Sequence, residues 1–209
     1  MTPEAFIERV EDENRTALSR LGSSKSLYAE TQGEMAAGTV LAAAADAEYH
    51  AAETYRTWAA EETNAEAKTA WATTADEEAT HYDRVTAEIE GEHEPSGPPA
   101  IQRELREMTD PVERAGGFLG RTLAADRSKS QVTGFFVGQA EPGLASLFRD
   151  FGDDLDAQRD RALDVLHAVC TDETDWDRAM EAATTAIQAA YDEYVETLEG
   201  MGVDPKPVC

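Results

Sequence analysis

The sequence predicts an all-α fold. Apolar residues recur at three- and four-residue steps along nearly the whole chain of 209 residues, and no alternating pattern typical of a β-strand appears. The net charge of −25 comes from acidic residues that are spread along the chain, which is typical of solvated helix faces. We therefore expect helices that each bury one face in a shared core, within a single domain of residues 1–209.

The expected helical segments follow one another with short breaks. They cover residues 2–20, 26–62, 65–91, 99–139, 143–169 and 173–200. Gly33 and Gly38 in the second segment, and Gly116 and Gly117 in the fourth, are positions where a long helix can be interrupted. The connector 92–99 cannot continue a helix, because its prolines lack an N–H donor and disfavour helical geometry before them.

The two halves of the chain match at a fixed offset of 77 residues. The matched positions are Trp58 with Phe135, Trp71 with Phe148, Asp76-Glu77 with Asp153-Asp154, and Asp83-Arg84 with Asp160-Arg161. This set indicates a duplicated helical hairpin, the first copy at about residues 26–91 and the second at about residues 100–169. Two such hairpins build a four-helix bundle, to which an N-terminal helix and a C-terminal helix at about 173–200 are added.

Two glutamates lie on the apolar stripes of the first hairpin. At about 100° per residue, Glu48 falls near the centre of the stripe within residues 41–59, and Glu78 near the centre of the stripe within residues 71–89. His81 falls at the margin of the second stripe. A buried carboxylate is costly unless it is paired or binds a metal. A Glu on one helix, with a Glu and a His on its neighbour, is half of a di-iron or di-manganese ligand set.

Glu48, Glu78 and His81 are therefore candidate metal ligands for iron or manganese. The alternative is that Glu78 and His81 form a local hydrogen bond, while Glu48 pairs with His81 or reaches solvent at the end of the bundle. The residues alone leave both interpretations open.

The spacing of these residues resembles the first hairpin of rubrerythrins, a branch of the ferritin-like superfamily. Glu48 is followed by an aromatic residue, Tyr55, and the next helix carries Trp71 ahead of the Glu78-Ala79-Thr80-His81 motif. The resemblance covers about residues 40–90. It implies a ferritin-like bundle, an iron or manganese site at Glu48, Glu78 and His81, and an oxidoreductase of the peroxidase or ferroxidase type. A small oxidant or a metal ion would be its partner.

The second hairpin departs from the rubrerythrin pattern. The offset of 77 residues places Ala125, Leu155 and Gln158 at the positions that correspond to Glu48, Glu78 and His81, and none of the three is a good ligand. Asp126 and Asp154 are one residue out of register and are expected to point away. The rubredoxin-like module of rubrerythrins is also missing, because it needs four cysteines and the chain has two.

Three hypotheses about the protein therefore remain open. In the first, a homodimer completes a dinuclear site from two copies of the first hairpin. In the second, each chain holds one metal ion with open coordination positions. In the third, a ferritin-like scaffold without metal chemistry serves as a binding or regulatory module.

The charge and composition argue against several other functional classes, such as nucleic-acid-binding and membrane proteins. A net charge of −25 opposes binding to nucleic acid or to anionic membranes, and no apolar run has the length of a signal peptide core or a membrane span. The acidic composition resembles that of cytosolic proteins of halophiles, so we expect a cytoplasmic protein. The glycine cluster at 116–120 lacks the strand and the lysine of a phosphate loop, and indicates a close contact between helices.

Overall fold

The computed structural model describes residues 2–206, and this part of the chain is helical without a strand. Its helices are α1 (Pro3–Glu13), α2 (Arg15–Leu21), α3 (Ser24–Glu30), α4 (Ala37–Glu61), α5 (Ala65–Thr86), α6 (Ala100–Glu107), α7 (Pro111–Gly138), α8 (Pro142–Val169) and α9 (Glu173–Gly200). The predicted all-α class is confirmed. Cys209, one of the two cysteines, lies outside the described residues.

The N-terminal region contains more breaks than the sequence predicted. The segment expected at 2–20 is interrupted at Asn14, whose side-chain amide donates a hydrogen bond of 3.0 Å to the carbonyl of Val10 and so competes with the helix backbone. The segment expected at 26–62 is interrupted around Gly33, which has a φ of +84°. Gly38 lies inside α4 and does not interrupt it.

The segment expected at 99–139 is interrupted at residues 108–110, between α6 and α7, and not at Gly116 or Gly117. Asp110 accepts hydrogen bonds from the backbone N–H groups of the first turn of α7, and Pro111 follows it directly. A capping aspartate with a proline in the first turn is a strong signal for a new helix. These local signals explain why the break lies here.

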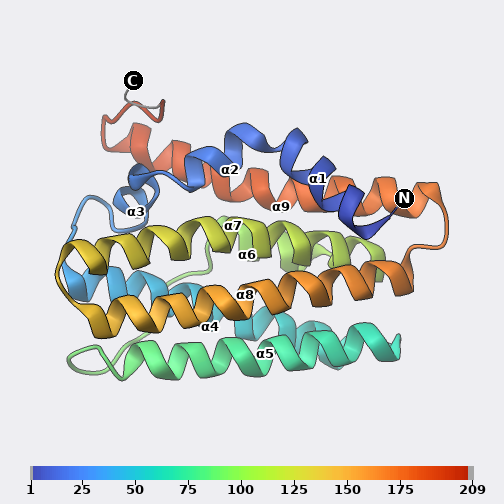
Figure 1. Cartoon of the computed structure of the whole chain (residues 1–209), viewed down its shortest axis with the longest axis horizontal. Coiled ribbons are helices and arrows are strands. Elements are labelled where there is room, and N and C mark those ends of the chain that lie inside the picture. The colour runs from blue at the N-terminus through green and yellow to red at the C-terminus, as the bar shows by residue number, and fades with distance from the viewer. Residues whose placement is uncertain (1, 207–209) are drawn as a thin grey trace.

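Two antiparallel helical hairpins form the body of the molecule. Helix α4 packs along α5, α7 packs along α8, and the two hairpins meet where α5 contacts α8. Helix α9 lies on the other side of α7, with α1 and α2 beside it (Figure 1). Both hairpins that the repeat predicted are therefore present, at α4–α5 and α7–α8.

Helix α9 approaches α7 closely because α7 carries glycines at the contact. A Cβ atom on Gly116 would lie 2.1 Å from the carbonyl oxygen of Ala179, and one on Gly120 would lie 2.4 Å from that of Ala183. Any side chain at either position would push the two helices apart. The close helix contact predicted from the glycine cluster is confirmed.

The core between the hairpins is rich in aromatic rings. Tyr55, Trp58, Trp71 and Phe118 are buried and meet at ring-centroid distances of 5.1–6.4 Å. This cluster fills the bundle about two helical turns from the two buried glutamates. In the described part of the chain, the helices are too short or too polar to cross a membrane.

Candidate metal centre

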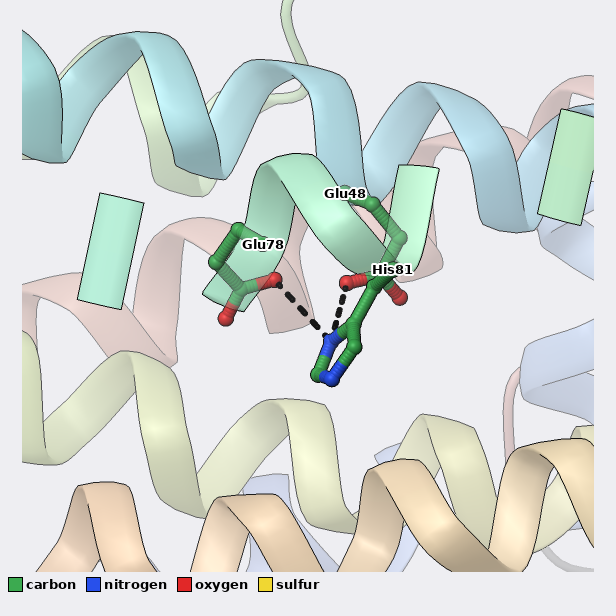
Figure 2. Close-up of side chains that lie close together, drawn as sticks. All are labelled: Glu48, Glu78 and His81. Carbon is green, nitrogen blue, oxygen red and sulfur yellow. Dashed lines mark ion pairs between the residues drawn. The ribbon is translucent and has the colours of Figure 1, made fainter. Parts of the chain in front are cut away.

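Three predicted ligands meet in the interior. Glu48 comes from α4, and Glu78 and His81 come from α5, and their exposed fractions are 1%, 0% and 2%. One potential ligand atom of each lies within 4.8 Å of the other two. Figure 2 shows the side chains pointing toward one another, with dashed lines from His81 to both carboxylates. Their predicted convergence is confirmed, whereas metal binding stays a prediction.

The helix faces explain why these side chains meet. Ala45 and Ala52 lie about one turn on either side of Glu48, and Ala75 precedes Glu78 by about one turn, all buried. Such small side chains leave room for the carboxylates between α4 and α5. The ring of His81 stacks on that of Phe151 from α8 at a centroid distance of 4.0 Å, which fixes the plane of the imidazole.

The outer atom of each ligand is held by the second hairpin. Lys129 donates a hydrogen bond to Oε1 of Glu48. Nη1 of Arg121 donates to Oε1 of Glu78 at 2.6 Å, and Nε2 of Gln158 donates to the same oxygen at 2.8 Å. These contacts orient both carboxylates and balance their charge.

Asp154 holds the outer nitrogen of the histidine. Nε2 of His81 lies 2.9 Å from Oδ2 of Asp154. The carboxylate can only accept, so we assign the proton of this hydrogen bond to Nε2. The sequence predicted that Asp154 is out of register with the ligand positions. Asp154 supplies no atom to the centre, but its half-exposed side chain reaches the outer nitrogen of His81 from the edge of α8.

The inner atoms of the three ligands have no hydrogen-bond partner among the described residues. They are Oε2 of Glu48, Oε2 of Glu78 and Nδ1 of His81. Nδ1 lies 3.4 Å from Oε2 of Glu48 and 3.9 Å from Oε2 of Glu78. In a neutral imidazole with its proton on Nε2, all three inner atoms are acceptors. Such an arrangement needs a cation between them, either a metal ion or a proton carried by Nδ1 of His81 or by the carboxyl group of Glu78.

The pKa directions agree with a site that attracts a cation. Burial opposes the charged form of His81, but the nearby carboxylate of Glu48, with that of Glu78, outweighs it and raises the pKa of His81 above its ordinary value. Burial would also raise the pKa of Glu48, but the ammonium of Lys129 holds that pKa well below its usual range. Burial raises the pKa of Glu78, and the charge of Glu48 adds to this against the pull of Arg121.

The residues that correspond to the ligands in the second hairpin take other roles. Gln158 is buried and bonds Glu78, Leu155 is buried, and Ala125 is half-buried beside a cavity that Glu48 also lines. Sequence reasoning missed Arg121 and Lys129. The available signal was their spacing, because they lie four residues before and after Ala125, on its face of α7.

No family model, curated protein sequence or solved structure matches this chain. The resemblance of residues 40–90 to rubrerythrins therefore stays a prediction.

Proposed function

We propose that this chain is a ferritin-like helical bundle that binds one divalent metal ion, iron or manganese, through Glu48, Glu78 and His81. The observation that carries the proposal is the set of three inner atoms without a hydrogen-bond partner, one from each ligand. The outer atoms of the same three groups are all held by neighbouring side chains. The ligands are therefore oriented toward a common point before any ion binds.

The donor set fits one ion. Two carboxylate oxygens and an imidazole nitrogen suit iron or manganese, and a histidine held by a carboxylate on its other nitrogen is common at metal sites. Within one chain, a second ion would need carboxylates from the second hairpin, but that hairpin places Arg121 and Lys129 against the two glutamates. These two cations would repel a second metal ion, whether its other ligands came from this chain or from a second copy. This supports a mononuclear site over a dinuclear site shared by a homodimer.

A metal ion bound here would supply one-electron redox chemistry toward a small oxidant such as a peroxide. The protein's own part is to orient the ligands and to set where their protons lie. Asp154 keeps the proton of His81 on Nε2, so that Nδ1 presents its lone pair to the centre. Lys129 holds the buried carboxylate of Glu48 in its ionised form, and Arg121 opposes the burial that raises the pKa of Glu78. The aromatic cluster fills the interior about two helical turns from the two glutamates.

A second candidate function is a bundle without metal chemistry that serves as a binding or regulatory module. The observation in its favour is that Arg121 and Lys129 already balance the charges of Glu78 and Glu48. A proton on Nδ1 of His81 would then fill the space between the inner atoms. In this form, the buried ion pairs specify how the two hairpins pack.

Titration with Mn(II) distinguishes the two functions. The wild-type protein, kept in about 1 M KCl to screen its charge, should bind one Mn(II) per chain by calorimetry and electron paramagnetic resonance. Glu78→Gln should abolish binding, because it removes an anionic ligand of nearly the same shape. Glu77→Gln is the matched control, since Glu77 pairs with Arg161 and supplies no ligand atom, and its link to the centre is one long hydrogen bond of 3.5 Å from Gln158.

The stoichiometry decides the outcome. Binding of two ions per chain would contradict the mononuclear site. Absence of binding by the folded wild-type protein would favour the metal-free module. Equal loss of binding in Glu77→Gln and Glu78→Gln would show that the effect is not specific to the centre.

A further inference from the structure

A cavity of about 510 Å³ opens between α4 and α7, next to the candidate metal centre. Helix α4 packs mainly on α5, and α7 packs mainly on α8 and α9, so the space between α4 and α7 is not closed by helix contact. Small side chains line both walls. They are Ala43, Ala44 and Ala47 on α4, and Ala124 and Ala125 on α7. A cavity of this size can hold a small organic molecule.

The inner end of the cavity is lined by Glu48, Arg121 and Lys129. The side chains of Arg121 and Lys129 are only 4% and 8% exposed. The ammonium of Lys129 carries three N–H donors and gives one hydrogen bond, to Glu48. The guanidinium of Arg121 bonds through Nη1 alone, so that Nε and Nη2 have no acceptor among the described residues. Two buried cations thus keep unused donors at this end.

We propose that the cavity between α4 and α7 binds a small aliphatic monocarboxylate. Its carboxylate accepts hydrogen bonds from Arg121 and Lys129 at the inner end, because a guanidinium and an ammonium are strong donors to a carboxylate. Its hydrocarbon part lies along the alanine walls and contacts Val132 and Phe148, which also line the cavity. The site is separate from the three metal ligand atoms, which accept no hydrogen bond from these donors and lie within 4.8 Å of one another.

A cationic ligand fits the cavity less well, although carboxylates surround its outer end. Asp46 accepts hydrogen bonds from the backbone and hydroxyl of Ser96. Glu193 accepts from the backbone N–H of Ala100 and pairs with Arg103. These acceptors already have donors, whereas the donors at the inner end lack acceptors. Oε2 of Glu48 also lacks a donor, but this atom is fully buried beside His81. The unmet donors of Arg121 and Lys129 therefore favour an anionic head group.

A bound metal ion would strengthen this site. The two cations at the inner end are balanced by Glu48 and Glu78, so a divalent ion adds two positive charges close to the ligand's carboxylate. Carboxylate and metal binding should then favour each other. This coupling rests on the proposed function, whereas binding of the monocarboxylate to the metal-free protein does not.

Calorimetry with three matched probes tests the proposal. Octanoate, 1-octanol and octylammonium share a hydrocarbon chain and differ in the charge of the head group. In metal-free protein in about 1 M KCl, octanoate should bind at least about tenfold more tightly than either of the others, because hydrogen bonds to charged groups are the strong ones. Equal binding of octanoate and octanol, or tighter binding of octylammonium, would overturn the proposal.

A cavity-filling variant tests where the probe binds. Ala125→Phe places a ring in the cavity, leaves both cations intact and should abolish octanoate binding. Ala72→Phe is the matched control, because Ala72 is exposed on α5 and does not line the cavity. Circular dichroism verifies that both variants are folded. Unchanged octanoate binding in folded Ala125→Phe would place the ligand elsewhere and refute the site.

Repeating the octanoate titration with Mn(II) present tests the coupling separately. If Mn(II) binds, octanoate affinity should rise several-fold, and an unchanged or lower affinity would refute the coupling. If Mn(II) does not bind, the proposed metal function fails. The comparison of the three probes in metal-free protein still decides whether the monocarboxylate site exists.

Discussion

Replacing Asp154 by asparagine should weaken metal binding without removing a ligand. Oδ2 of Asp154 lies 2.9 Å from Nε2 of His81, and the Asp154 side chain is 48% exposed, so the substitution costs the fold little. Asparagine keeps an acceptor oxygen and loses the negative charge that makes the imidazole a stronger ligand. Loss of such an outer partner weakens metal affinity by about 10- to 100-fold, or about 1.4–2.8 kcal/mol.

The assay is a Mn(II) titration followed by calorimetry, with the affinity of each variant compared under the same high-salt conditions. Asp153→Asn is the control, because Asp153 is an exposed neighbour and its substitution changes the net charge by the same amount. We expect the control to bind like the wild type within about twofold. An equal loss in both variants would trace the effect to overall charge, and no loss in Asp154→Asn would refute the positioning role of the Asp154 to His81 hydrogen bond.

Three further outcomes are expected. Gly116→Ala should destabilise the protein by about 1–3 kcal/mol in denaturant unfolding, because the new Cβ would lie 2.1 Å from the carbonyl oxygen of Ala179. Gly134→Ala is the control, because Gly134 lies on an exposed face of α7, and it should stabilise the protein by about 0.4–1 kcal/mol. Mn(II) affinity should rise with pH through the raised pKa of His81, because below that pKa a proton on Nδ1 competes with the metal. An Mn(II) affinity that does not change with pH would contradict this. The same proton stabilises the metal-free protein, so this part of the free energy of unfolding is complete below about pH 6.5 and is lost as the pH rises through the folded-state pKa of His81. Dialysis into dilute buffer should lower the helix content measured by circular dichroism, because a net charge of −25 repels itself when salt is removed, and full retention of cooperative unfolding would contradict this.

The helices and the three ligand candidates could be predicted because both depend on local periodicity. A residue's angle around its helix follows from its position in the sequence, so the apolar pattern was enough to assign Glu48 and Glu78 to the buried stripes. His81 was predicted at the margin of its stripe, and the structure places it fully inside. Breaks such as the one at Asn14 were missed, because a side chain that bonds its own backbone hardly changes the apolar pattern.

The surroundings of the ligands were decided only by the tertiary structure. Arg121 and Lys129 are long side chains, and their charged ends lie far enough from the backbone to reach carboxylates on another helix. Which carboxylate each one reaches depends on how α7 is shifted along α4 and α5, and no local pattern records that shift. The same applies to Asp154, whose angle on α8 pointed away from the centre although its carboxylate reaches His81. The sequence alone therefore determined that two glutamates lie on the apolar stripes of neighbouring helices with a histidine beside them. The packing of the second hairpin decided that all three are buried and which of their atoms have no hydrogen-bond partner.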